Sequence, residues 1–204
     1  MKIFVIGHSG SGKSTVAKAI TENSEVNRIR TFTTRPRREG EGYDDYIFVD
    51  THELDSLGLV AVRSYDTVIN DYPAVYTYGV RRSDLKLNGH HVIITDAEGY
   101  LDLIDTVVPR EEAILLYLDV DKDILKSRAA SRPDFSSAEW NRRYAADSSS
   151  LNRDRIDLLA KSPSTSIQYK IYILDGNKDI DNVVSDALQV LVENSITVNK
   201  NLIK

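Results

Sequence analysis

Short apolar segments alternate along this chain with longer segments in which apolar residues recur at helical spacing. The apolar segments have the length of buried strands, and several end at a glycine or an aspartate, where a turn is expected. The predicted strands span residues 2–6, 92–95, 113–118 and 171–174, and the predicted helices span residues 98–106, 121–131, 137–160 and 179–193. Strands that alternate with helices in this way predict an α/β fold with a parallel sheet and helices on both of its faces.

Residues 31–80 depart from this alternation. Three short segments, residues 46–49, 59–62 and 75–78, alternate there with polar turns. Their β-branched and aromatic residues are typical of strands. The stretch therefore predicts a small antiparallel or mixed sheet that is inserted into the α/β core.

The composition restricts the class of protein. The 204 residues carry a formal net charge of −5, from 26 Lys and Arg against 31 Asp and Glu, so we expect no binding of a nucleic acid polymer or an anionic membrane. The chain has no cysteine, which excludes a disulfide scaffold and a Cys-ligated metal. No apolar run reaches the length of about 18 residues that a membrane span needs. We expect a cytoplasmic monomer or homodimer that binds small molecules.

Residues 7–14, Gly-His-Ser-Gly-Ser-Gly-Lys-Ser, match the phosphate-binding P-loop motif G-x-x-x-x-G-K-[ST]. The motif follows a predicted buried strand and precedes a helical pattern at residues 15–20, which is the context that it requires. Its glycines let backbone N–H groups face phosphate oxygens, and the helix N-terminus adds positive potential. We expect Lys13 to contact the β- and γ-phosphates of ATP, and Ser14 to bind Mg²⁺. The predicted ATP-binding residues in this segment are Gly7, Ser9, Gly10, Ser11, Gly12, Lys13, Ser14 and Thr15.

Two groups of arginines suggest where an acceptor phosphate is held and how it reacts. The first group is Arg35, Arg37 and Arg38, and the second is Arg128, Arg132 and Arg143. Guanidinium groups bind a phosphate dianion in bidentate geometry, which suits the first group. The second group lies in a predicted helix–loop–helix. Such a flap can close over phosphates, exclude water and stabilise the charge of a transition state.

Taken together, the P-loop, residues 33–49 and the spaced arginines resemble guanylate kinase, a P-loop nucleoside monophosphate kinase. The family pattern T-T-R-x-P-R-x-G-E, followed by G-x-D-Y-x-F, is matched with one residue missing. The matching residues are Thr33-Thr34-Arg35, Gly40-Glu41 and Asp45-Tyr46-Ile47-Phe48. Tyr78-Gly79 resembles the Y-G element of the family, and Asp96 with Gly99 resembles D-x-Q-G. The resemblance extends from residue 3 to about residue 190.

The resemblance implies a P-loop NTPase-type core at residues 1–30, 81–125 and 145–204, an NMP-binding insertion at 31–80, and a helical lid at 126–144. It also implies ATP-dependent phosphorylation of a nucleoside monophosphate with Mg²⁺. The catalytic residues that it implies are Lys13, Arg128, Arg132 and Arg143. The implied acceptor-binding residues are Thr31, Arg35, Arg38, Tyr46, Tyr78 and Asp96. Arg37 is the alternative to Arg38, because one residue of the pattern is missing. Asp175 falls near the segment that approaches adenine.

The departures from the family concern the base of the acceptor. Family members recognise guanine with a serine, a glutamate and a serine or threonine, where this chain has Thr31, no glutamate between residues 55 and 78, and Val80. Asp66 or Asp71 replaces the glutamate only if the loop is shifted. A buried polar group left unpaired costs about 1–3 kcal/mol, so we expect relaxed base selection with phosphoryl transfer retained.

Two alternatives to a nucleoside monophosphate kinase stay open at the level of the sequence. The first is a kinase for another phosphorylated metabolite, such as a ribose bisphosphate or a modified deoxynucleotide. The second is a non-catalytic binding module with a guanylate kinase-like fold. Lys13, Ser14 and the arginines of the predicted lid argue against the second, since binding alone does not require them.

Overall fold

The computed structural model describes residues 1–37, 42, 46–69, 72–131, 135–150 and 170–199 of the chain. Its larger sheet has five parallel strands in the order β2-β7-β1-β8-β9. These strands are β1 (Lys2–Gly7), β2 (Asn27–Ile29), β7 (His91–Ile94), β8 (Ala113–Asp119) and β9 (Lys170–Asp175). The predicted parallel sheet is confirmed. Strand β2 was not predicted from the sequence. It has three residues, two of them polar, which are too few to show the hydrophobic period of a strand.

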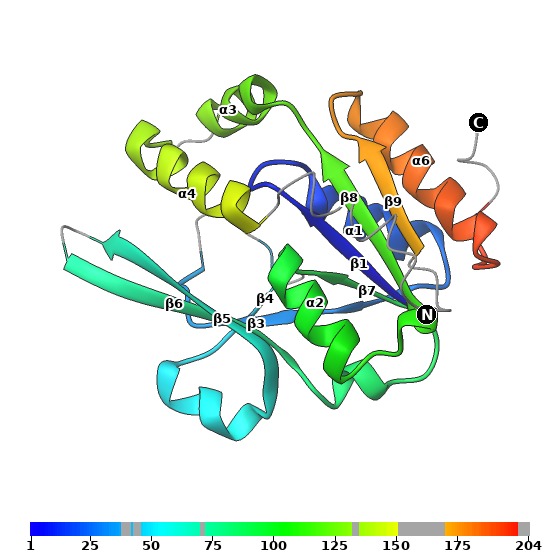
Figure 1. The fold of residues 1–204 in the computed structure, drawn as a ribbon, viewed down its shortest axis with the longest axis horizontal. Helices are drawn as coiled ribbons and strands as arrows, with labels where there is room; N and C mark the ends of the chain where they lie inside the picture. Colours follow the sequence, from blue (N-terminus) through cyan, green and yellow to red (C-terminus); the bar gives the residue numbers. More distant parts are fainter. Residues whose placement is uncertain (38–41, 43–45, 70–71, 132–134, 151–169, 200–204) are drawn as a thin grey trace.

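Helices cover both faces of this sheet, as predicted (Figure 1). On one face lie α1 (Lys13–Asn23) and α6 (Ile180–Glu193), and on the other lies α2 (Ala97–Thr106). Successive residues of β1 supply both layers, because side chains of a strand point alternately to opposite faces. Ile3 and Val5 are buried with α1 and α6, whereas Phe4 and Ile6 are buried with α2. Burial on both sides explains why β1 is continuously apolar.

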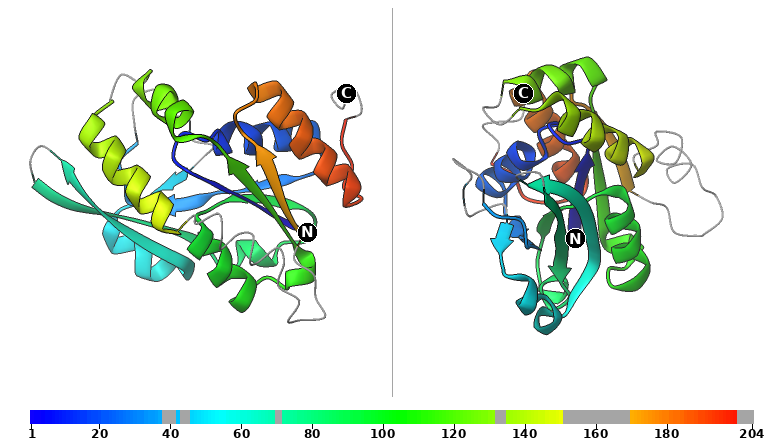
Figure 2. Two further views of the ribbon diagram at one scale, coloured as in Figure 1. Left: turned by 45° about the horizontal axis from the view of Figure 1, so that its top comes forward. Right: turned by 90° about the vertical axis from the view of Figure 1, so that its left-hand side faces the viewer.

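A second, smaller sheet has the strand order β4-β3-β6-β5. Its strands are β3 (Thr31–Thr33), β4 (Tyr46–Phe48), β5 (Leu59–Ile69) and β6 (Tyr72–Arg81). Strands β3 and β4 are parallel and the other pairs are antiparallel, so the sheet is mixed, as predicted. The hairpin of β5 and β6 is longer than the predicted strands, and it projects away from the five-stranded sheet (Figures 1 and 2).

The remaining elements connect and cover these sheets. Helices α3 (Lys122–Ala130) and α4 (Ser137–Ser150) form a pair above the hairpin (Figure 1), and residues 151–160 of the predicted helix 137–160 lie outside the described residues. Three 3₁₀ helices are η1 (Thr51–Leu57), η2 (Asp84–Lys86) and η3 (Arg110–Glu112). The α3–α4 pair has an apolar centre of its own, in which Leu125 of α3 packs with Trp140 of α4. Within the described ranges, no helix combines the length and the apolar character needed to cross a membrane.

Candidate active site

The P-loop connects the carboxyl end of β1 to the start of α1. Gly12 caps α1 with φ of 97°, a left-handed conformation that favours glycine. A Cβ atom on Gly7 would lie 2.9 Å from the carbonyl oxygen of Leu118, so glycine also allows the loop to approach β8. No acidic residue lies in the first turn of α1. The N-terminal end of this helix therefore presents uncompensated positive potential to an anion.

Side chains of the P-loop divide into one set that faces the solvent and one that does not. Lys13 folds over the loop, where its Nζ donates hydrogen bonds to the carbonyl oxygens of Gly7 at 2.7 Å and His8 at 2.8 Å. Ser14 and Thr15 are exposed at the start of α1. Ser11 is buried, and its N–H donates to the carbonyl oxygen of His8 at 3.0 Å. The predicted ATP contact of Ser11 therefore requires a change in this hydrogen bond.

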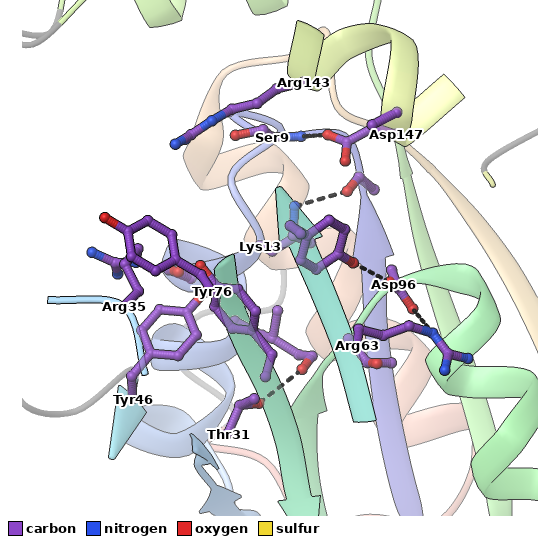
Figure 3. Close-up of a pocket in the computed structure, with 18 of the residues that line it drawn as sticks. Ser9, Lys13, Thr31, Arg35, Tyr46, Arg63, Tyr76, Asp96, Arg143 and Asp147 are labelled. Carbon is purple, nitrogen blue, oxygen red and sulfur yellow. Dashed lines mark hydrogen bonds and ion pairs between the residues drawn. The ribbon is translucent and has the colours of Figure 1, made fainter. Parts of the chain in front are cut away.

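A single cleft of about 1340 Å³ joins most of the predicted donor and acceptor residues (Figure 3). Pockets for one small ligand have volumes of roughly 300–1,000 Å³, so this cleft has room for two. From the predicted site it is lined by Gly7, Ser9, Gly10, Gly12, Lys13, Ser14, Thr15, Thr31, Arg35, Tyr46, Tyr78, Asp96, Arg128 and Arg143. Arg38 and Arg132 lie outside the described residues, and Arg37 is exposed.

Arg35 is held at the acceptor side of the cleft by aromatic rings. Its side chain is only 6 % exposed, and its guanidinium carbon lies 5.4 Å from the ring centre of Tyr46 and 5.6 Å from that of Phe48. One guanidinium nitrogen donates to the carbonyl oxygen of Pro36 at 2.9 Å. Tyr46 in turn contacts Tyr78 edge to face, with ring centres 5.9 Å apart. This arrangement places a fixed cation and two tyrosines together, a combination suited to a phosphate dianion.

The floor of the predicted acceptor side has few groups that could recognise the edge of a base. The hydroxyl of Thr31 already donates to the carbonyl oxygen of Ile94 at 3.3 Å. Val80 lines the cleft with 2 % of its surface exposed and has no polar side-chain atom. Asp66 is exposed on β5 and is absent from the cleft lining, and Asp71 lies outside the described residues. The base-recognising glutamate therefore has no replacement at Asp66.

Alternation along the hairpin explains why Asp66 faces away. A register shift between Val60 and Arg63 is followed by regular pairing of Arg63 with Tyr78 and of Tyr65 with Tyr76. Directly paired residues of antiparallel strands share one face, and the next residue along each strand points to the other. Arg63, Tyr65 and Tyr76 all line the cleft. The sequence analysis did not identify them, although the two-residue spacing in this segment is the signal that relates them.

Arg63 and Tyr65 bind the hairpin to α2 and to its N-cap residue, Asp96. Arg63 donates to Asp102 at 2.6 Å and lies 3.7 Å from Glu98. It also lies 4.0 Å from Asp96 (Figure 3). Burial lowers the pKa of Arg63, but the hydrogen bond and charge of Asp102 and the other two carboxylates outweigh burial and raise it. The guanidinium is therefore permanently charged, and three carboxylates compensate that charge.

Asp96 is held on both of its carboxylate oxygens. One oxygen accepts the N–H of Gly99 at 2.6 Å and so caps α2, and the other accepts the hydroxyl of Tyr65 at 2.5 Å. Burial, followed by the charge of Asp96, raises the pKa of Tyr65 well above its ordinary value. Tyr65 therefore stays protonated as the donor. These contacts fix the predicted acceptor residue Asp96 at the end of β7, beside the P-loop strand.

Helices α3 and α4 bring arginines to the donor side of the cleft. Arg128 donates to the carbonyl oxygen of Gly176 at 3.0 Å, which connects α3 to the segment after β9. Arg143 and its neighbour Arg142 both line the cleft, although only Arg143 was predicted. Asp175, the last residue of β9, accepts the N–H of Asn177 at 3.0 Å, and this predicted ATP-binding residue is absent from the cleft lining. The cleft is lined there by Ile180, whose Cδ1 lies 3.5 Å from a Cβ built on Gly12.

Helix α4 also contacts the P-loop directly. The Asp147 carboxylate accepts the backbone N–H of Ser9 at 2.6 Å (Figure 3). The imidazole of His8 stacks on Tyr144, with ring centres 5.1 Å apart, and its Nε2 lies 3.1 Å from the hydroxyl of Ser148. Burial lowers the pKa of His8, which favours the neutral ring. Motif analysis did not identify this contact, because it joins residues more than 130 positions apart.

The donor atoms near the P-loop are suited to a hydrated Mg²⁺ ion more than to a softer metal. Within the described part of the chain, no three His, Cys, Asp or Glu side chains form a group that could hold a metal ion. Ser14 offers an exposed hydroxyl at the start of α1. Mg²⁺ usually keeps several waters and is bound by one or two protein oxygens plus substrate phosphates. Ser14 with a bound triphosphate fits that pattern.

Comparisons with known proteins support the fold. No protein-family model matches this chain, and no curated protein matches its sequence. Among solved structures, the guanylate kinase from Anaplasma phagocytophilum superposes with a TM-score of 0.52 at 18% identity, over 94% of this chain and 85% of that chain. A sugar kinase from a Janibacter species superposes with a TM-score of 0.49 at 16% identity, over 94% of each chain. The five-stranded parallel sheet, together with the guanylate kinase superposition, shows a P-loop kinase-like α/β fold.

Proposed function

We propose that this protein transfers the γ-phosphoryl group of ATP to a nucleoside monophosphate and yields ADP and a nucleoside diphosphate. The observation that carries the proposal is the single cleft, which Lys13 lines from the P-loop and Arg35, Tyr46 and Tyr78 line from the smaller sheet. Phosphoryl transfer requires little covalent chemistry from the protein. It requires two phosphate groups to be held in line, with their charge compensated.

Each side of the cleft has a distinct task in this reaction. P-loop N–H groups and Lys13 bind the β- and γ-phosphates, while Arg35 with Tyr46 and Tyr78 holds the acceptor phosphate. Ser14, together with the phosphates, would hold Mg²⁺, and the ion would supply charge compensation on the donor. An acceptor oxygen forms a bond to the γ-phosphorus as the bond to the β–γ bridging oxygen breaks. Arg143 compensates the charge that spreads over the transferred group.

Among acceptors, the geometry favours a nucleoside monophosphate over a sugar bisphosphate. A second phosphate at the far end of the acceptor would need a cation, and Arg63 is the cation that β5 brings to the cleft there. Asp96, Glu98 and Asp102 already compensate its charge. A flat neutral base fits better against the aromatic surface that Tyr65 and Tyr76 present to the cleft, because stacking on aromatic rings needs no cation and is tolerant of base identity.

Base selection should therefore be weak. The hydroxyl of Thr31 is already hydrogen-bonded, Val80 has no polar side-chain atom, and no glutamate occurs between residues 55 and 78. Guanine therefore lacks the edge contacts that would distinguish it from other bases. Losing base contacts reduces discrimination before it reduces turnover, since every monophosphate shares the phosphate contacts. We expect GMP, dGMP, AMP, dTMP and dCMP to differ in kcat/KM by less than about a thousandfold, or ~4 kcal/mol.

The experiment is a coupled ADP-release assay with Mg-ATP and each of these monophosphates. Lys13→Ala protein is the control for release that does not depend on the P-loop. Acceptor-dependent ADP release that the control lacks supports the proposal. Release with none of the monophosphates contradicts it, and release with a sugar bisphosphate alone would show that the acceptor class is wrong. A preference for GMP above a thousandfold would contradict the base argument only.

A further inference from the structure

We propose that the carboxylate of Asp147 occupies a phosphate-binding position of the P-loop and must be displaced when a nucleotide binds. The inference rests on the proposed function in one respect, which is that the displacing ligand is ATP or ADP. It adds a residue that sets the nucleotide affinity of the donor site. Its action lowers that affinity, which is the opposite of what a ligand-binding residue does.

The first observation is the chemistry of the contact. Asp147 lines the cleft and accepts the N–H of Ser9 at 2.6 Å, a short, charge-assisted hydrogen bond. P-loop N–H groups are arranged to bind anionic oxygens, and a carboxylate oxygen is such an anion. Ser9 is one of the residues predicted to bind ATP. A side chain of α4 therefore uses a donor that is predicted to bind phosphate.

The second observation is that the contact belongs to a docked helix. Tyr144, Asp147 and Ser148 are spaced three and four residues apart, so they lie on one face of α4. All three contact the P-loop, through the stacking on His8, the hydrogen bond to Ser9 and the contact with the His8 imidazole. Behind this face, Trp140 stacks on Tyr144 at 5.2 Å and packs with α3. Side-chain packing therefore supports the position of Asp147.

Charge makes the two occupants incompatible. A nucleotide phosphate and the Asp147 carboxylate are both anions, and the N–H of Ser9 has one hydrogen to donate. Binding of phosphate at Ser9 requires Asp147 to leave. Arg143 lies one turn before Asp147 on the same helix and also lines the cleft. The same helix therefore carries both the anion that competes with the phosphates and a cation that suits them.

Isothermal titration calorimetry with ADP and with inorganic tripolyphosphate tests this inference. Asp147→Asn keeps the shape of the side chain and removes its charge, so both ligands should bind about tenfold more tightly, given the strength of a charged hydrogen bond. Asp147→Ala should do the same and serves if the first variant is poorly folded. The matched control is Asp123→Asn, which removes one charge from the exposed surface of α3. Its affinities should equal those of the wild type.

The outcomes separate this inference from the proposed function. If the wild type and both Asp147 variants bind ADP with equal affinity, the inference is overturned and the proposed function stays intact. An equal gain in affinity in Asp123→Asn would also overturn the inference, since the effect would then come from the net charge of the protein. Absence of ADP binding in the wild type and in all variants would refute the proposed function and the inference together. Tighter binding in the Asp147 variants alone supports both.

Discussion

Removing the ion pair between Arg63 and Asp102 should weaken both the fold and the acceptor site. The nitrogen–oxygen distance of 2.6 Å gives a charge-assisted hydrogen bond, a type that contributes about 1.5–3 kcal/mol when well formed. Arg63 is 24% exposed and Asp102 is 50% exposed, so solvent screens part of this interaction. We therefore expect a coupling free energy of about 1–2 kcal/mol between the two side chains.

A double-mutant cycle measures that coupling. Urea unfolding of Arg63→Ala, Asp102→Ala, the double variant and the wild type gives four free energies of unfolding, from which the pairwise interaction is obtained. The control cycle uses Arg81 and Asp84, which lie 4.0 Å apart with side chains 39% and 26% exposed. The control coupling should be about 0–0.5 kcal/mol, as for other exposed pairs. The coupling of Arg63 with Asp102 should also fall as salt is added.

The same variant has a functional consequence under the proposed function. Arg63 fixes the hairpin that carries Tyr65 and pairs with the strand of Tyr78, but it does not contact the P-loop residues that bind ATP. Arg63→Ala should raise the KM for the acceptor and leave the affinity for ATP unchanged. A coupling no greater than that of the control pair, together with an unchanged acceptor KM, would refute this account of the hairpin.

Four further results are expected. Lys13→Ala should abolish phosphoryl transfer with an unchanged unfolding curve, because the charge of Lys13 is needed on the phosphates, whereas its Nζ donates to carbonyl oxygens of the P-loop itself; unchanged turnover would contradict the P-loop assignment. Arg35→Lys should raise the acceptor KM and lower kcat, since lysine cannot bind phosphate in bidentate geometry; wild-type values of both would show that the acceptor is placed wrongly. Arg143→Ala should lower kcat far more than ATP affinity, measured by steady-state kinetics and calorimetry, and a preserved kcat would count against its role. Burial, and then the charge of Lys2, lowers the pKa of His91, whose Nδ1 lies 3.0 Å from Lys2 Nζ. The unfolded state therefore binds the extra proton more readily, and the free energy of unfolding should fall as pH drops below about 6.5, less steeply in His91→Gln; equal slopes would exclude His91 as the cause.

The donor half of the site could be predicted from sequence because it is local. One loop and the start of one helix supply Gly12, Lys13 and Ser14, and their spacing alone predicts the loop that lines the cleft. The parallel core was predictable for a similar reason, since β1 and β8 are apolar on both faces. The acceptor phosphate site required a family pattern, because Arg35, Tyr46 and Tyr78 come from separate segments.

The rest of the site depends on contacts between distant segments. The hydrogen bond of Arg63 to Asp102 depends on the register of the hairpin and on the position of α2. Neither can be recognised from a local sequence pattern. Asp147 lies on a helix with a weak apolar face, where an acidic residue is ordinarily exposed to solvent. Asp66, in contrast, was a candidate from the sequence that does not line the cleft. Its carboxylate is suited to base recognition, but the alternation of side chains along β5 turns it away from the cleft.

The packing of Trp140 against Tyr144 has a spectroscopic consequence. The chain has one tryptophan, so selective excitation of indole reports on α4 and on no other part of the molecule. The ring is stacked on Tyr144 and lies 5.7 Å from the ammonium group of Lys126, and Tyr144 in turn stacks on His8 of the P-loop. Emission from this indole is therefore sensitive to the position of α4. The unlabelled protein carries its own optical probe, placed two stacked rings away from the phosphate-binding loop.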